Sequence, residues 1–156
     1  MPEVLFYQLS QRPLERALPE LLEKTVAKGW RAVVRCASEP RLDALNRVLW
    51  SFDAESFLPH GTAADGAAER QPIYLTTGEE TPNRPDLLFL VDGVTASPDV
   101  LSGYTRACIV FDEADPEALS TARASWKAVT AADIPAVFWA QGEGGRWVKK
   151  AEKRPE

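Results

Sequence analysis

Two short runs stand out among those of the chain that are apolar at every position and bounded by polar or turn-forming residues. They are Leu87–Val91 and Ala107–Phe111. A strand with one solvated face alternates apolar and polar residues, whereas a strand that is buried on both faces is apolar throughout. Two such strands require helices on both faces of their sheet. This requirement favours an α/β architecture with a largely parallel sheet.

The remainder of the sequence alternates strand-like and helix-like patterns. Val4–Leu9 and Ala32–Cys36 have the character of strands, and apolar residues recur at helical spacing after each of them. Gly29 stands where the first helix should end, and Ser38 can cap the second. Asp115 and Pro116 predict the start of a third helix. The apolar faces of the three helices are Leu14, Leu18, Leu21, Leu22 and Val26, then Leu42, Leu45, Val48 and Leu49, then Leu119, Ala122, Trp126 and Val129.

The C-terminal part predicts a β-hairpin, because Ala136–Ala140 and Arg146–Val148 flank a glycine-rich turn. A loop is predicted over residues 61–71, and a short strand at Ile73–Leu75. A chain of 156 residues supports one well-formed core. We therefore predict a single three-layer α/β/α domain over residues 1–150, with a mostly parallel central sheet and a C-terminal β-hairpin. Residues 151–156 are predicted to form a charged tail.

The formal net charge of −5 bears on possible partners. Nucleic-acid binding depends on phosphate neutralisation by Lys and Arg, so DNA contact is expected to be indirect. The longest apolar runs reach five or six residues, so neither a membrane span nor a secretory signal is expected. Cys36 and Cys108 lack metal-site spacing and are predicted to be buried free thiols in a reducing, cytoplasmic setting. No cofactor and no metal is expected.

The segment Asp112–Asp115 has the composition of a nucleotide-hydrolysing acidic motif. That chemistry needs a glycine-rich phosphate loop that ends in Lys and Ser or Thr. Gly61 and Gly66 instead precede Ala67-Ala68, where the motif needs Lys and Ser or Thr, so the acidic run is interpreted as a strand end and a helix cap. A nucleotide-binding or helicase-like α/β domain without such a loop remains the alternative function, and a small-molecule site at the strand ends is a third.

The segment from Leu49 to Gly61 is unusually apolar for the exit of a helix. It contains three aromatic residues and His60, the only histidine of the chain, with no catalytic partner at a chemical spacing. Solvated loops are normally polar, so this segment either packs onto the core or contacts another protein.

Arg123 and Lys127 are four residues apart and therefore lie on one face of the third predicted helix, with Trp126 beside them. Two cations next to an indole can hold a carboxylate beside an apolar group. The alternative is that Trp126 belongs to the core stripe while both cations simply face water.

The chain resembles the chi subunit family of the bacterial DNA polymerase III holoenzyme over nearly its whole length. The most specific markers are Leu49-Trp50 with Glu55–His60. The others are Val4–Tyr7, Arg84–Leu88, Ala122-Arg123 with Trp126-Lys127, and the ending Phe138–Gln141 with Trp147–Lys150. The resemblance implies a non-catalytic adaptor with an α/β/α fold.

The resemblance also implies two partners. One is the psi subunit, which joins chi to the clamp loader, and its expected contacts here are Trp50, Phe57 and His60. The other is the acidic C-terminal tail of single-stranded DNA-binding protein, expected at Arg123, Trp126 and Lys127. Three positions where the family often carries basic or aromatic residues are Ser125, Val129 and Thr130 here, so tail binding is expected to be weaker. Lys149 or Lys150 on the predicted hairpin is a candidate for compensation.

Overall fold

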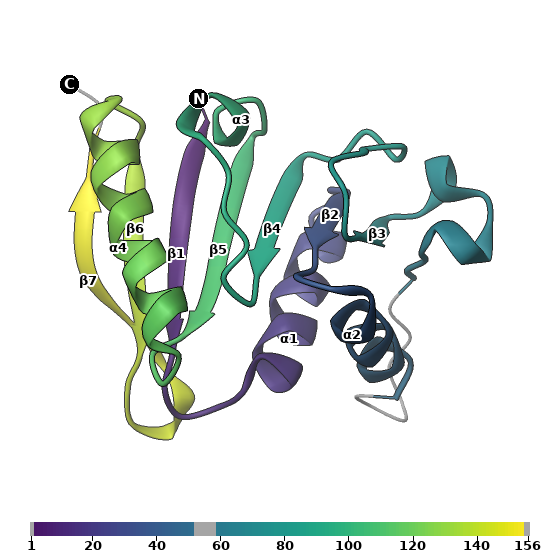
Figure 1. Ribbon diagram of the computed structural model, residues 1–156, viewed down its shortest axis with the longest axis horizontal. Coiled ribbons are helices and arrows are strands. Elements are labelled where there is room, and N and C mark those ends of the chain that lie inside the picture. Colours follow the sequence, from purple (N-terminus) through teal and green to yellow (C-terminus); the bar gives the residue numbers. More distant parts are fainter. Residues whose placement is uncertain (1, 52–58, 155–156) are drawn as a thin grey trace.

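A seven-stranded sheet forms the centre of the computed structural model, which describes residues 2–51 and 59–154. The strand order is β3-β2-β4-β5-β1-β6-β7 (Figure 1). Neighbouring strands are parallel except β6 and β7, which are antiparallel. The predicted mostly parallel sheet with a C-terminal hairpin is therefore confirmed. The strands are β1 (Glu3–Leu9), β2 (Ala32–Arg35), β3 (Ile73–Thr76), β4 (Leu87–Val91), β5 (Arg106–Asp112), β6 (Ala136–Gln141) and β7 (Trp147–Lys153).

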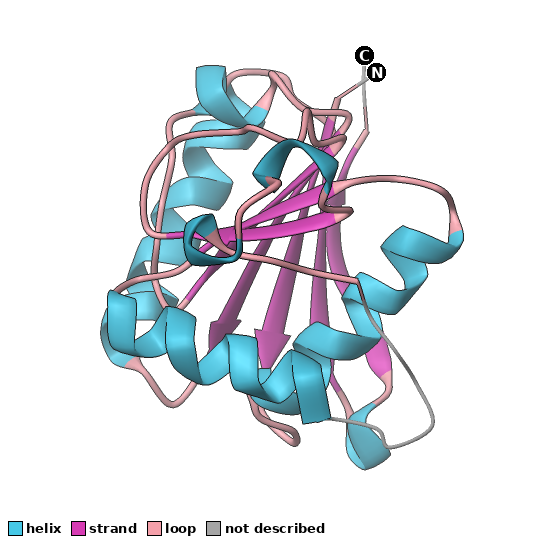
Figure 2. Ribbon diagram, turned by 90° about the vertical axis from the view of Figure 1, so that its right-hand side faces the viewer, coloured by secondary structure: helices cyan, strands magenta, loops and turns pink. Residues whose placement is uncertain are grey.

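Helices cover both faces of this sheet (Figure 2). Apolar residues of α1 (Leu14–Ala27) and α2 (Glu39–Ser51) belong to the core on one face. Apolar residues of α3 (Pro98–Leu101) and α4 (Pro116–Ala131) belong to the core on the other. The predicted three-layer α/β/α arrangement is confirmed.

The helices begin and end at the residues that the sequence indicates. The Asp115 carboxylate accepts hydrogen bonds from the backbone N–H groups of Glu117 and Ala118, at 3.1 and 3.3 Å, and so caps α4. Gly29 follows the end of α1 with φ of 77°, a left-handed conformation that glycine adopts at little cost. The Ser38 hydroxyl accepts from the N–H of Arg41 at the start of α2.

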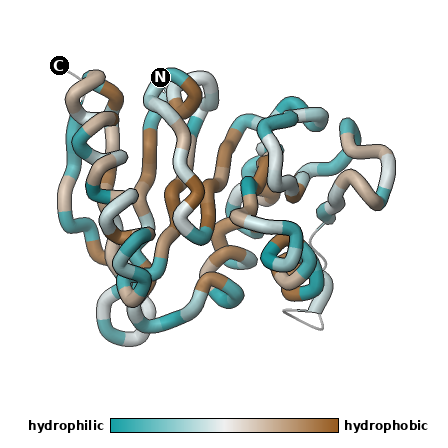
Figure 3. The backbone as a smooth tube through the Cα atoms, in the orientation of Figure 1, coloured by the Kyte–Doolittle hydropathy of each residue, from teal (hydrophilic) through white to brown (hydrophobic). Residues whose placement is uncertain are grey.

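The two faces of the sheet carry separate apolar cores because successive strand residues point in opposite directions. In β1, Leu5 and Leu9 join the core beneath α1 and α2, whereas Val4 and Phe6 join the core beneath α4. All five residues of β4 are at most 2% exposed, as expected for a strand covered on both sides. The central strands are coloured as largely hydrophobic in Figure 3.

Several local features were not predicted. The single turn of α3 was missed, and two 3₁₀ turns, Ala63–Asp65 and Ala68–Arg70, lie within the segment predicted as a loop. β7 extends to Lys153, so residues 151–153 of the predicted tail belong to the last strand. They pair with β6 as a largely exposed edge, and an exposed edge carries no apolar pattern that marks its end.

Candidate functional site

The outer face of α4 carries the two predicted cations. Arg123 and Lys127 are both exposed, and the structure gives neither an ion pair with a described carboxylate. They border a shallow depression of about 550 Å³ whose apolar part includes Leu119 and Ala124. This depression can hold a carboxylate against the cations and an apolar group against Leu119.

Trp126 occupies a different side of the same helix. Its half-buried ring lies edge-on to Phe6 and Phe138, with ring centroids 5.4 and 5.8 Å apart. Both contacts belong to the core beneath α4. The indole does not line the depression beside Arg123 and Lys127, and it holds α4 onto the sheet.

Ser125, Val129 and Thr130, the three positions noted above as departures from the family pattern, also lie on α4. Ser125 and Val129 are buried on its inner face. The Thr130 hydroxyl donates to the backbone carbonyl of Trp126 at 2.8 Å. The exposed cations of this face are therefore Arg123 and Lys127 within the part of α4 that the structure describes.

The C-terminal end of α2 presents a second candidate surface. Trp50 is 58% exposed, which is the highest value among the large apolar side chains that the structure describes. Its ring packs against that of His60, with centroids 4.8 Å apart, and His60 is itself buried. Leu49 belongs to the core, and Phe57 lies outside the described residues. The structure thus brings Trp50 and His60 together.

Gly61, which directly follows His60, pairs with β3 at the edge of the sheet. The N–H of Gly61 donates to the carbonyl of Ile73, and the N–H of Leu75 donates to the carbonyl of Gly61, at 3.0 and 2.9 Å. A side chain at Gly61 would come within 2.8 Å of the Gln71 side chain, so glycine permits this close approach. This pairing fixes the backbone next to His60, whose ring contacts that of Trp50.

The two candidate surfaces lie far apart. The helix α4 crosses the β1 and β6 end of the sheet, whereas α2 lies near β3 at the other end (Figure 1). They also project from opposite faces of the sheet. Partners bound at the two surfaces would therefore not compete for the same area.

The carboxylates of the acidic run at the end of β5 (Arg106–Asp112) accept hydrogen bonds from nearby groups of the protein. Asp112 accepts a hydrogen bond from the N–H of Ala114, Asp115 caps α4, and Glu113 accepts one from the Gln8 side chain. These contacts fit the interpretation of the run as a strand end and a helix cap. No cluster of three or more possible metal ligands occurs among the described residues.

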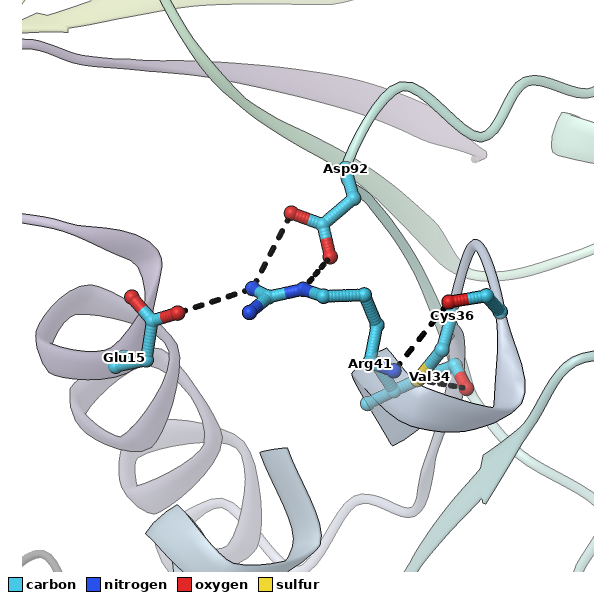
Figure 4. Close-up of polar contacts among 6 residues, drawn as sticks. Glu15, Val34, Cys36, Arg41 and Asp92 are labelled. Atoms are coloured by element: carbon cyan, nitrogen blue, oxygen red, sulfur yellow. Dashed lines mark hydrogen bonds and ion pairs between the residues drawn. The ribbon is translucent and has the colours of Figure 1, made fainter. Parts of the chain in front are cut away.

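A salt-bridge network occupies the carboxyl edge of the sheet, where open α/β sheets usually bind ligands (Figure 4). The Arg41 guanidinium donates to Asp92 at 2.7 and 3.4 Å and to Glu15 at 3.0 Å. The hydrogen bond to Asp92 is the main cause that raises the pKa of Arg41. The network joins α2 to α1 and to the turn after β4, and only a small cavity of about 140 Å³ lies beside it. This crowding counts against a nucleotide site at the strand ends.

Cys36 and Cys108 are both buried and free, which confirms the predicted state of the thiols. Burial raises the pKa of each thiol to about 12. Neither group is poised as a nucleophile, since that role requires a thiolate.

Comparison with known proteins identifies the family of the chain. A family model described as "DNA polymerase III chi subunit, HolC" matches residues 1–136. The chain therefore belongs to the DNA polymerase III chi subunit family. The match ends at Ala136, so most of the hairpin formed by β6 and β7 lies beyond it.

Individual relatives carry the same designation. The chain is 32% identical over 94 residues to "DNA polymerase III subunit chi" of Pseudomonas aeruginosa, and 26% identical over 94 residues to the protein so named from Escherichia coli. Both alignments cover 60% of this chain and 63% of the relative. A "Probable DNA polymerase III subunit chi" of Rickettsia prowazekii is 28% identical over 91 residues, or 58% of this chain and 55% of the relative. The chain thus spans between about half and two thirds of the length of these relatives.

No helix in the described part of the chain is long and apolar enough to cross a membrane.

Proposed function

We propose that this protein is a non-catalytic accessory subunit of DNA polymerase III in DNA replication. In this role it links the clamp loader, through a psi subunit, to the acidic C-terminal tail of single-stranded DNA-binding protein. The observation that carries the proposal is the separation of an exposed tryptophan surface and an exposed cationic surface at opposite ends of one rigid sheet. An adaptor needs two sites that can be occupied together.

The tail is proposed to bind the depression on α4. Its carboxylates would pair with Arg123 and Lys127, and its apolar terminal ring would rest on Leu119. Two surface cations and one small apolar contact support only a modest affinity, of roughly micromolar order. Tethering several tails in one assembly would raise the effective affinity.

The test of the tail site is a titration with the synthetic tail peptide. Arg123→Ala should weaken binding about tenfold, equivalent to about 1.4 kcal/mol. The variant Arg16→Ala removes another exposed arginine, from α1, and serves as the matched control. Equal affinity of folded Arg123→Ala and the control for the peptide would refute this assignment.

The psi subunit is proposed to cover Trp50, with His60 supporting the ring from behind and Phe57 contributing from the neighbouring segment. Exposed tryptophans are over-represented among residues that dominate interfaces, where truncation often costs about 2 kcal/mol or more. Trp50→Ala should therefore weaken the complex with the psi subunit at least about twentyfold. The control Val100→Ala trims another exposed apolar residue, on α3. Co-purification of Trp50→Ala with psi at the affinity of the unaltered protein would exclude this surface.

A further inference from the structure

On the face where α1 and α2 lie, no helix of the described residues covers the end of the sheet formed by β6 and β7. On the face covered by α1 and α2, the strands β1, β6 and β7 present a row of half-buried aromatic and apolar side chains. Tyr7 and Trp147 meet edge-on there, with centroids 4.9 Å apart. Val137 and Trp139 continue the row along β6.

A cavity of about 310 Å³ opens between the last turns of α1 and the strands β4, β5 and β1 beside this part of the sheet. Most of its lining is apolar, and it includes Trp30, Phe89 and Cys108. A neighbouring hollow of about 440 Å³ extends over Val137 and Trp139. Tyr7, Leu21, Lys24 and Arg106 line both spaces, which therefore adjoin across these side chains. We call the two adjoining spaces together the groove.

Cations border this groove and cover the faces of its tryptophans. The side chains of Lys28 and Arg106 both lie 5.1 Å from the centre of the Trp30 ring. Lys149 lies 5.7 Å from the centre of the Trp139 ring. Each contact is within the range of a cation–π interaction.

The carboxylates near the groove neutralise only part of this charge. Glu3 pairs with Arg106 at 2.7 Å, and Glu152 pairs with Lys149 at 3.5 Å. No ion pair of the described residues involves Lys24 or Lys28. The groove is therefore locally positive in a chain whose net charge is −5.

We propose that this groove binds an extended acidic peptide segment that places one large apolar side chain in the cavity beside Trp30 and Cys108. Carboxylates of the segment would pair with Lys24 and Lys28 at the rim. The proposal does not rest on the proposed function, and the β6 and β7 wall of the groove lies almost wholly outside the region that the family model matches.

Single-stranded nucleic acid fits the same groove less well. Bases bind by stacking on exposed aromatic faces, but cations already lie over the faces of Trp30 and Trp139. An apolar cavity with an unpaired cationic rim instead matches an apolar side chain flanked by carboxylates.

The test uses a fluorescein-labelled probe peptide, Gly-Asp-Asp-Asp-Leu-Phe with an amidated C-terminus, in low-salt anisotropy titrations of the full chain. The amide removes the terminal carboxylate, which is one of the groups proposed to pair with the cations of α4. The double variant Lys24→Ala/Lys28→Ala should weaken binding about tenfold. The control Arg16→Ala/Arg47→Ala changes the net charge equally on the outer surfaces of α1 and α2, and should change affinity less than about twofold.

A second variant tests the cavity independently of charge. Ala27 is the last residue of α1 and lines the cavity, so Ala27→Phe should fill part of it and weaken the probe about tenfold. The control Ala131→Phe makes the same change at the exposed last residue of α4. Replacement of the three aspartates of the probe by serine should also abolish the effect of Lys24→Ala/Lys28→Ala.

Three results would overturn the proposal. The first is no measurable binding of the probe, and the second is binding that neither Ala27→Phe nor Lys24→Ala/Lys28→Ala alters. The third is that oligo(dT) binds more tightly than the probe and that Lys24→Ala/Lys28→Ala no longer binds oligo(dT). This result would assign the groove to nucleic acid.

Discussion

Trp126 and Arg123 are three residues apart on α4, but Trp126 packs on the sheet whereas Arg123 faces solvent. Substitution of Trp126 should therefore lower stability, and substitution of Arg123 should weaken peptide binding. The Trp126 ring lies edge-on to Phe6 and Phe138 and anchors α4 to the sheet. Arg123 is exposed and has no described carboxylate partner. We expect Trp126→Ala to destabilise the fold and Arg123→Ala to leave its stability almost unchanged.

The size of the effect follows from burial and ring contacts. Removal of a fully buried large aromatic side chain costs about 3–5 kcal/mol, and an aromatic pair adds about 0.5–1.5 kcal/mol. Because Trp126 is half-buried but makes two edge-on contacts, we expect a loss of about 2–3 kcal/mol. In a domain of this size that loss lowers Tm by roughly 5–10 °C. Exposed substitutions such as Arg123→Ala usually change stability by less than about 0.5 kcal/mol.

Calorimetry and tail-peptide titration of the same preparations provide the comparison. Trp126→Phe retains a ring against Phe6 and should lose about half as much stability as Trp126→Ala. Titrations at a temperature well below the lowered Tm show whether either variant still binds the peptide. If Trp126→Ala keeps the Tm of the unaltered protein and loses the peptide, then the indole belongs to the binding site and our account of the core is wrong.

Other predictions concern buried polar groups. The folded-state pKa of Cys36 and Cys108 is raised to about 12 from 9.0, so the stability due to the neutral buried thiols is complete below pH 9.0 and falls above it. Each thiol should lower the free energy of unfolding by about 1.4 kcal/mol per pH unit in that range, which urea titrations of Cys→Ala variants can measure. The Gln141 side-chain oxygen accepts hydrogen bonds from three backbone N–H groups, at 2.9, 3.0 and 3.0 Å. Gln141→Leu should therefore lower the free energy of unfolding by about 2–3 kcal/mol, measured by chemical unfolding. A change near zero would contradict this account. Asp92→Asn weakens the partly exposed pair with Arg41 and should cost about 1 kcal/mol at low salt and less at high salt.

Apart from α3, the sequence was sufficient to predict the order of strands and helices along the chain, because each pattern depends on local spacing. The fully apolar β4 and β5 indicated helices on both faces, and the glycine-rich turn indicated the terminal hairpin. The start of α4 followed from the capping chemistry of Asp115. The turn α3 carried no such pattern, since one helical turn is too short to show an apolar repeat.

Spacing on one helix could bring Arg123 and Lys127 together, but it could not decide where Trp126 points. That choice depends on Phe6 and Phe138, which come from β1 and β6, far away in the sequence. The network of Arg41, Asp92 and Glu15 was missed for the same reason. Its members come from three elements, and only the fold brings them together.

The course of the chain explains why binding surfaces occur where they do. Helices α1 and α2 follow β1 and β2 and lead the chain toward the β3 edge, so on their face they leave β6 and β7 bare. Helices α3 and α4 follow β4 and β5 and lead it back toward β6 on the opposite face. Two oppositely directed crossovers therefore place Trp50 near one edge of the sheet and the α4 cations near the other. The groove lies on the face of the sheet opposite α4, beside α1. Since a rigid sheet separates these surfaces, occupation of one should alter the affinity of another mainly through charge, and that coupling should fade as salt screens it.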